Sequence, residues 1–294
     1  MVKEADMTNY NLNNMTLIIG AGSLGSALVS GREIYGEADD FDTGKNYISI
    51  YDIDKKKKKL FKNNPDVKFI KNLSDAVKGS KIIILTVKPK DYKVVCKSIK
   101  NDIKKSTIII SLMAGIKISD LRKELFNDTK IVRVMTHIGI EMNSGTAFIY
   151  ANNKINNSDK KKIDSFFGLL CILGKVHWLK SENNFDKYTA LIGSGPAYVM
   201  YFGECLVKVF KKFGLSNGEA NLHAALLLES SASLAKMYDS NIFFNYIKNR
   251  VASKGGTTEQ ALKVLQSSNF EKILEKAIRQ AYSKSRNMLN KKNG

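Results

Sequence analysis

Three glycines near the N-terminus have the spacing of a loop that binds a dinucleotide. Gly20, Gly22 and Gly25 follow the apolar run 16–19 and precede a segment of helical period. Glycines so placed allow a tight turn, close approach of the backbone to a pyrophosphate, and close packing of the helix on the strand. The N–H groups of the following helix would face the phosphates. A glycine-rich turn without a ligand is the alternative interpretation. We expect coenzyme contacts from Gly20, Ala21, Gly22, Ser23, Leu24 and Gly25.

An acidic residue that could hold the adenosine ribose follows the second apolar run, 47–51. Asp52 lies further from Gly22 than the roughly 20 residues of the usual pattern, and residues 36–46 account for the excess as a surface insertion. A carboxylate there would accept a hydrogen bond from a 2′-hydroxyl and favour NADH. The lysines of 55–59 argue for NADPH if one of them pairs with its 2′-phosphate, or they form a solvated helix face. The coenzyme, NADH or NADPH, stays undecided.

Two glycine-containing segments in the C-terminal half could hold a small substrate. The first, 189–198, places Pro196 at the start of a long helical segment. The second, 251–260, is a Gly-Gly loop before another helix, with Thr257 and Gln260 spaced as a capping box. One interpretation is a well-capped helix with no ligand. The other is that loop N–H groups and the helix dipole hold a small carboxylate, while the Ser253 and Thr258 hydroxyls face the substrate.

The elements that position these residues change in type near residue 181. Before it, predicted strands alternate with predicted helices, which is typical of parallel βαβ units. The strands are expected at 16–19, 47–51, 82–87, 107–112 and 131–135, with helices after the glycine loop and at 55–62, 92–100 and 118–125. Lys88-Pro89 and 111–115 follow such strands, at the edge where open sheets bind ligands. The alternative interpretation is that both segments are ordinary transitions from a strand to a loop.

From residue 182 onward the sequence predicts helices alone. They are expected at 196–213, 217–238, 241–249, 258–266 and 270–289, with Gly214 ending the first. Apolar residues such as Tyr198, Met200, Tyr201 and Phe202 occupy more than one face of their helix, which indicates packing against a second subunit. We predict a polar tail (1–14), an α/β Rossmann-type domain with a mostly parallel sheet (15–181), and an all-α domain for substrate binding and dimerisation (182–294).

Composition adds little about function. The formal net charge is +19, from 47 basic and 28 acidic residues, but lysines are scattered from end to end and only six of the basic residues are arginine. A compositional bias explains this pattern better than a nucleic-acid partner, which usually requires basic residues on one face. The three cysteines have wide spacing and apolar neighbours, which indicates buried thiols and no metal site. With no signal segment and no apolar run near 20 residues, we expect a soluble, cytoplasmic protein without a membrane span.

Taken together, these segments resemble the pyrroline-5-carboxylate reductase family. The matching stretches run in the family's order over nearly the whole chain from about residue 16: 20–28, 87–89, 113–115, 132–135, 145–147, 189–198, 253–258 and the closing helix. The two segments of the helical half are more specific than the glycine loop. The segment 136–139 departs from the family's usual Pro-Asn-x-Pro, with His137 in place of the amide; Lys254 replaces a proline, and Arg250 stands where an amide is expected.

The resemblance implies a site on both domains. Beside the glycine loop, the implied coenzyme contacts are Asn72, Thr86, Val87, Lys88, Pro89, Met113, Ala114 and Gly115. The implied substrate contacts are Glu182, Thr189, Gly193, Val251, Ser253, Thr257 and Thr258. It also implies dimers formed through the helical domain and assembled into a larger ring.

The implied reaction is reduction of the cyclic imine Δ1-pyrroline-5-carboxylate to L-proline by NAD(P)H. A protonated imine is already an electrophile, so the protein must orient it rather than supply a strong acid. Ser253 and Thr257 are expected to hold the carboxylate, and Thr258 to act catalytically by hydrogen bonding at the ring nitrogen.

Two other functions are the alternatives to this reaction. The first is that of a Rossmann oxidoreductase of the hydroxyacid or 6-phosphogluconate type, which would need a lysine acid/base in the cleft. The second is non-enzymatic binding of nucleic acid, with an affinity that would fall steeply as the salt concentration rises.

Overall fold

The structure is a computed structural model that describes residues 15–33, 48–64, 67–237 and 243–287. The expected tail (1–14) and the expected insertion (36–46) lie outside these residues. The chain divides into two compact units, one formed by residues 1–193 with 282–294 and the other by 194–281. The change of type predicted at residue 182 therefore falls inside the first unit, which also receives the end of the last helix.

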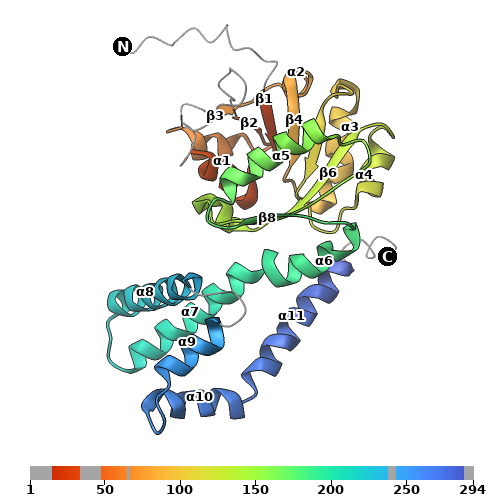
Figure 1. Ribbon diagram of the computed structural model, residues 1–294. Helices are drawn as coiled ribbons and strands as arrows, with labels where there is room; N and C mark the ends of the chain where they lie inside the picture. The colour runs from red at the N-terminus through yellow and green to blue at the C-terminus, as the bar shows by residue number, and fades with distance from the viewer. Residues whose placement is uncertain (1–14, 34–47, 65–66, 238–242, 288–294) are drawn as a thin grey trace, which may run out of the picture. The chain divides into compact units, whose positions relative to one another are not determined.

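The first unit is built on an eight-stranded sheet in the order β3-β2-β1-β4-β5-β6-β7-β8 (Figure 1). Neighbouring strands are parallel except β6 and β7, so the predicted mostly parallel Rossmann-type sheet is confirmed. The strand order reverses between β1 and β4, the position where such sheets bind ligands at their carboxyl ends. The strands are β1 (Met15–Ile19), β2 (Ile48–Tyr51), β3 (Val67–Phe69), β4 (Ser80–Leu85), β5 (Ile108–Ser111), β6 (Lys130–Met135), β7 (Thr146–Ala151) and β8 (Lys175–Trp178).

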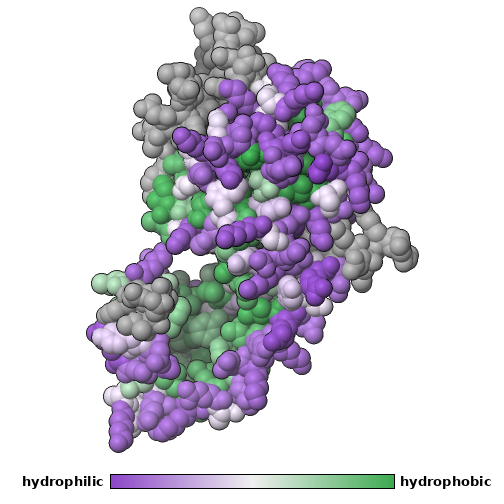
Figure 2. All heavy atoms as spheres, turned by 45° about the vertical axis from the view of Figure 1, so that its right-hand side comes forward, coloured by the Kyte–Doolittle hydropathy of each residue, from purple (hydrophilic) through white to green (hydrophobic). Residues whose placement is uncertain are grey.

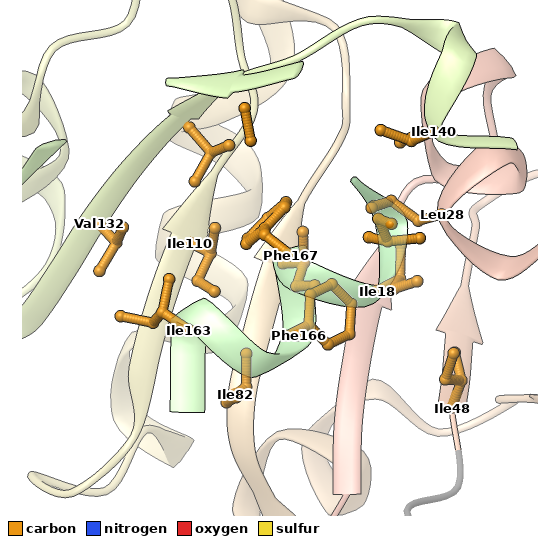
Figure 3. Packing of buried hydrophobic residues seen from close by; sticks show 14 of the residues in the cluster. Ile18, Leu28, Ile48, Ile82, Ile110, Val132, Ile140, Ile163, Phe166 and Phe167 are labelled. Carbon is orange, nitrogen blue, oxygen red and sulfur yellow. The ribbon is translucent and has the colours of Figure 1, made fainter. Parts of the chain in front are cut away.

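Successive side chains of the central strands enter two separate cores. Ile18, Ile82 and Ile110 face one core, together with Phe166 and Phe167 (Figure 3). Their sequence neighbours face the other core, on the opposite side of the sheet. Burial on both faces explains why these strands read as continuous apolar runs. Helices α1 (Ser23–Glu33) and α5 (Asn157–Leu170) cover the first face, and α2 (Leu73–Gly79), α3 (Tyr92–Ile99) and α4 (Ile118–Glu124) the second.

The sequence prediction missed three strands and three α-helices of this unit and mistook the type of another helix. β3, β7, β8, α2, α5 and α6 were not predicted, and the helix expected at 55–62 is a 3-10 helix, η3 (Lys55–Phe61). Further 3-10 turns are η4 (Pro89–Asp91), η5 (Lys100–Asp102), η6 (Ile138–Met142) and η7 (Glu182–Asn184). α6 (Phe185–Tyr188) and a π-helical turn, η8 (Thr189–Gly193), are the last elements of this unit before the chain enters the second unit at residue 194.

The second unit is helical throughout its described residues, and its helices match the predicted ones to within a few residues. They are α7 (Gly195–Lys212), α8 (Asn217–Lys236), α9 (Phe243–Val251), α10 (Thr257–Ser267) and α11 (Phe270–Arg286). Pro196 stands in the first turn of α7, where its missing N–H costs no hydrogen bond. Gly214 follows the helix with a φ of +97°, which glycine adopts most readily.

Much of the apolar surface of the second unit is exposed. Met200 and Tyr201 on α7 are 63% and 65% exposed, and Leu222 on α8 is 57% exposed. Figure 2 shows broad apolar areas on this unit, whereas the first unit presents mostly polar side chains. By length and composition alone, the stretch Glu182–Lys212 is long and apolar enough to cross a membrane. Of its apolar 18-residue segment, 11% is buried. The expectation that no apolar run approaches that length is therefore wrong.

Candidate functional site

The carboxyl ends of five strands bring most of the predicted coenzyme residues to one edge of the sheet. Ile19 is in register with Tyr51 of β2 and with Leu85 of β4, and Leu85 is in register with Ser111 of β5. Ser111 in turn pairs with Arg133 of β6. The segments that follow these residues therefore lie side by side. They are 20–25, 52–57, 86–89, 112–115 and 136–139.

The glycine loop has the geometry that a pyrophosphate requires. Gly20 has a φ of +113°, and a Cβ there would stand 2.9 Å from Thr86. A Cβ on Gly25 would collide with the carbonyl oxygen of Gly20, so both positions require glycine for internal packing. Around Gly22, by contrast, nothing lies within 4 Å of where a Cβ would stand. The backbone at Gly22 is thus open to close approach, next to the N-terminus of α1.

Asp52 anchors this loop to the end of β2. Its Oδ2 accepts hydrogen bonds from the N–H of Ala21 (2.7 Å) and from Nζ of Lys57 (2.8 Å), and its Oδ1 accepts one from the N–H of Asp54 (2.8 Å). Burial alone would raise the pKa of Asp52, but the hydrogen bonds from Lys57, Ala21 and Asp54 outweigh it and lower that pKa. The carboxylate is therefore ionised at neutral pH.

Thr86 supports the loop from β4. Its hydroxyl donates to the carbonyl oxygen of Gly20 (2.7 Å), and its N–H donates to Ile19 (2.9 Å). Val87 is half-buried and Lys88 is exposed, at the start of η4, whose first residue is Pro89. These contacts make Thr86 a residue that shapes the glycine turn.

Two other predicted coenzyme segments have local structural roles as well. The amide of Asn72 caps α2: its Oδ1 accepts from the N–H of Ser74 (3.1 Å). Met113 is buried, Ala114 is half-buried, and Gly115 has a φ of +74° in the turn after β5. Each of these segments presents backbone at the ligand edge of the sheet.

Glu182, a predicted substrate contact, forms a partly buried ion pair. Its Oε1 accepts from Nη1 of Arg133 (2.8 Å) and from the N–H of Ile118 (2.9 Å), and the guanidinium of Arg133 lies 4.5 Å from the ring centroid of Phe185. Arg133 was not predicted as a site residue. The available signal was a single charged residue in the otherwise apolar strand 131–135, because a buried charge requires a partner.

Thr189 and Gly193 lie on the π-helical turn η8. The Thr189 hydroxyl donates to the carbonyl oxygen of Phe185 (2.8 Å). A Cβ on Gly193 would stand 3.1 Å from Sδ of Met135, at the carboxyl end of β6. Turns of this type occur mostly within α-helices and are frequent at functional sites. Glu182, Thr189 and Gly193 thus lie in the same unit as the coenzyme residues.

The remaining predicted substrate residues lie in the second unit, at the end of α9, on the loop that follows it and at the start of α10. Val251 ends α9, Ser253 and Thr257 are exposed, and Thr258 is half-buried in the first turn of α10. Within the described residues, the Thr257 and Thr258 hydroxyls make no hydrogen bond to another protein group. Both hydroxyls are therefore available to a ligand.

The capping box predicted for Thr257 and Gln260 is wrong. Gly256 is the N-cap of α10, which makes Thr257 its first helical residue. The side chain that reaches back is Glu259, whose Oε2 accepts from the N–H of Gly255 (2.7 Å). Of the family departures nearby, Lys254 is exposed and Arg250 lies 5.7 Å from the ring centroid of Tyr246.

His137, the third departure, is turned toward the backbone of its own loop. Its Nδ1 lies 3.1 Å from the N–H nitrogen of Gly139 and its Nε2 lies 3.2 Å from that of Thr146. A neutral imidazole has one acceptor nitrogen, so only one of these contacts is a hydrogen bond at a time. Burial lowers the pKa of His137. An imidazolium would direct N–H groups at both backbone donors.

This arrangement predicts that His137 makes the protein less stable in acid. Because the folded-state pKa lies below the unfolded value of about 6.5, the unfolded chain binds the proton more readily, and stability falls as pH drops below about 6.5. Urea unfolding at pH 7.5 and pH 5.5 should show a larger loss for the wild type than for His137→Asn. Burial and the nearby Lys175 also lower the pKa of His177, but this contribution is common to both proteins and cancels. An equal loss in both would show that His137 does not titrate on unfolding.

Within the described residues, no group of three or more His, Cys, Asp and Glu side chains could hold a metal ion. Burial raises the pKa of Cys96 to about 12 and that of Cys171 to about 11, so both thiols are protonated and unreactive at neutral pH. Cys205 is half-buried rather than buried. The open backbone at Gly22 and the closed packing at Gly20 and Gly25 fit a dinucleotide.

Two family models match separate parts of the chain. One, described as NADP oxidoreductase coenzyme F420-dependent, matches residues 16–115, which hold the glycine loop and the first five strands. The other, described as pyrroline-5-carboxylate reductase dimerisation, matches residues 182–288. The second match covers the apolar stretch Glu182–Lys212 and assigns the helical half of the chain to dimer formation.

Relatives and solved structures agree with these matches. The pyrroline-5-carboxylate reductase of Aquifex aeolicus is 32% identical over 76% of this chain and 78% of its own length. That of Pseudomonas aeruginosa is 28% identical over 91% of this chain and 94% of its own. A crystal structure of the Plasmodium falciparum pyrroline carboxylate reductase with NADP bound has a TM-score of 0.79 at 26% identity, covering 94% of this chain and 98% of that one. With a glycine loop at the sheet edge, a helical segment that matches the dimerisation model and a relative 32% identical over 76% of this chain, the chain belongs to the pyrroline-5-carboxylate reductase family.

Proposed function

We propose that the protein reduces the cyclic imine Δ1-pyrroline-5-carboxylate to L-proline with NAD(P)H, the last step of proline biosynthesis. The observation that carries this proposal is a glycine loop fit for a dinucleotide in a chain whose helical half matches the reductase dimerisation family. A nicotinamide coenzyme bound at this loop would supply a hydride for the imine carbon. The imine nitrogen, already protonated, becomes the ring amine of proline.

The residues of this chain then have to bind and orient the substrate. The Ser253 and Thr257 hydroxyls and the loop N–H groups hold the carboxylate, and the Thr258 hydroxyl hydrogen bonds at the ring nitrogen. Support comes from the availability of both threonine hydroxyls and from the position of the loop at the start of α10, whose dipole favours an anion. Val251 supplies apolar surface at the end of α9. Gly193 supplies backbone surface at the end of η8.

Glu182 and Thr189 have restricted roles in this proposal. The Oε1 of Glu182 is bound to Arg133 and Ile118, so any contact with substrate is left to Oε2. The Thr189 hydroxyl donates its hydrogen bond to the carbonyl oxygen of Phe185, so toward the substrate it can act only as an acceptor. Both residues therefore shape the site near the carboxyl end of β6 and add at most one acceptor each.

A steady-state assay with the imine and each coenzyme tests the proposed function. Oxidation of NADPH or NADH that depends on the imine and yields proline supports it. The matched control is Gly22→Asp, whose Cβ would have no protein atom within 4 Å and whose carboxylate would oppose the approach of the pyrophosphate. No turnover with either coenzyme would contradict the proposal.

We also propose that dimers formed through the helical unit assemble into a larger ring in the cytoplasm. The exposed apolar residues of α7 and α8 give each chain a large surface that one partner covers. A dimer has twice the 32.8 kDa mass of one chain. Light scattering should give a mass equal to two or more such dimers. Tyr201→Glu, which adds a charge to this surface, should lower the mass at micromolar concentration. A monomer mass for the wild type would contradict the dimer, and a dimer mass would contradict the ring.

A further inference from the structure

The run of five lysines after β2 contains one that differs from the others. Lys55, Lys56, Lys58 and Lys59 are exposed, whereas Lys57 is half-buried and its Nζ lies 2.8 Å from Oδ2 of Asp52. The run forms η3, directly beyond the carboxyl end of β2. Asp52 in turn accepts from the N–H of Ala21 in the glycine loop. Lys57 is therefore held beside the coenzyme loop by an ion pair, whereas Lys55 lies over the ring of Tyr51, with its Nζ 4.5 Å from the ring centroid.

The carboxylate of Asp52 has little capacity left for a ribose. Each carboxylate oxygen accepts about two hydrogen bonds. Oδ2 already accepts from Ala21 and Lys57, and Oδ1 accepts from Asp54. Asp52 is also only 8% exposed. A ribose hydroxyl would have to displace Lys57 from Oδ2 or use the one remaining acceptor position of Oδ1, so a side chain of the protein itself restricts the usual interaction that favours NADH.

The charge of this segment favours a phosphate group instead. Residues 52–59 contain two carboxylates, Asp52 and Asp54, against five ammonium groups. In sheets of this order the adenosine ribose lies at the carboxyl end of the second strand, and an Asp or Glu there contacts its 2′-position. A 2′-phosphate at this place would meet an excess of positive charge, with Lys57 already ordered by Asp52. Lysine binds phosphate well as a point charge.

We propose that the Asp52–Lys57 pair makes this protein selective for NADPH, with Lys57 binding the 2′-phosphate and Asp52 holding Lys57 in place. The inference rests on coenzyme binding at the glycine loop, which is part of the proposed function. Asp52, expected from the sequence to favour NADH, would thus be a positioning residue for the opposite coenzyme. Selectivity would come from one ordered ammonium group rather than from the lysine run as a whole.

The experiment is calorimetric titration of the full-length protein with NADP+, NAD+ and 2′,5′-ADP, in the absence of imine. The wild type should bind NADP+ at least 10-fold more tightly than NAD+, and should bind 2′,5′-ADP detectably. Lys57→Met should lower the ratio of the two affinities at least 10-fold by weakening NADP+ and 2′,5′-ADP. Lys59→Met, which removes an exposed lysine from the same short helix, should keep the ratio within twofold of the wild type.

A second variant guards against disturbance of the loop. Lys57→Met combined with Asp52→Asn removes both charges and leaves an amide oxygen to accept from Ala21, and it should also lose selectivity while still binding NAD+. Three results would overturn the inference: a wild type that binds NAD+ as tightly as NADP+, an equal loss of both coenzymes in Lys57→Met, or an equal loss of selectivity in Lys59→Met. Selective NADP+ binding without imine turnover would contradict only the proposed reaction. No binding of either coenzyme would contradict both.

Discussion

Replacing Thr258 by alanine is expected to lower kcat/KM for imine reduction about 10- to 150-fold while the protein stays folded. The hydroxyl is half-buried in the first turn of α10 and makes no hydrogen bond to protein within the described residues. A hydrogen bond to a group that changes charge contributes about 1.5–3 kcal/mol. Each 1.36 kcal/mol of transition-state stabilisation corresponds to a tenfold change in rate. The expected loss follows if this hydroxyl bonds the ring nitrogen.

Thr258→Ser is the control, because it keeps the hydroxyl and should retain most of the activity. Thermal unfolding of all three proteins must accompany the kinetics. Capping does not depend on Thr258, since Gly256 is the N-cap and Glu259 reaches back to Gly255. Thr258→Ala should therefore unfold within a few degrees of the wild type. Reduced stability with unchanged kcat/KM per folded molecule would assign Thr258 a structural role and remove it from the site.

The second large effect is expected on stability, from Glu182→Ala. This change leaves the guanidinium of Arg133, whose side chain is 5% exposed, without its carboxylate, and it removes the acceptor of the Ile118 N–H. Breaking a buried ion pair by removing one partner costs about 3–5 kcal/mol. Because the Glu182 side chain is 18% exposed and Arg133 keeps its contact with Phe185, we expect a loss near the lower end, about 3 kcal/mol. Urea unfolding at fixed protein concentration measures it.

A double variant separates the two possible roles of Glu182. Arg133→Met with Glu182→Leu removes both charges and should destabilise the protein by less than the sum of the single variants. Glu182→Gln should lie between the wild type and Glu182→Ala, because an amide oxygen still accepts from Ile118. If Glu182 serves substrate alone, Glu182→Ala would raise KM and leave the free energy of unfolding unchanged, and the ion pair would have no structural importance.

Elements with strong local signals could be predicted from the sequence. The helices of the second unit have the 3.6-residue period over many residues, and α7 carries a proline in its first turn and Gly214 after its end. The central strands are continuous apolar runs because both of their faces are buried. The glycine loop was predictable because backbone geometry and packing require glycine at Gly20 and Gly25, and because Gly22 completes the known spacing. In each case the signal itself is contained in a short stretch of the sequence.

The missed features depend on contacts between distant residues or on small local choices. β3 has three residues, all half-buried, and β8 is an edge strand with one exposed and three half-buried residues, so neither gives a clear apolar pattern. Arg133 and Glu182 are 49 positions apart, and no spacing rule connects them. Which lysine of 55–59 meets Asp52 depends on the 3-10 form of η3. The start of α10 was misplaced by one residue because the backbone at Gly256 decides which residue caps the helix.

The end of α11 has a consequence for biosynthesis of the chain. The Ser285 hydroxyl is buried and donates to Oδ1 of Asp186 (2.7 Å), a residue 99 positions earlier. The first unit therefore includes a contact from a residue that the ribosome translates after the entire second unit. Domains commonly fold one after another as they emerge, N-terminal first. Here the α/β unit begins first and is completed last, so chains truncated before Ser285 leave the ribosome with Asp186 lacking this hydrogen bond.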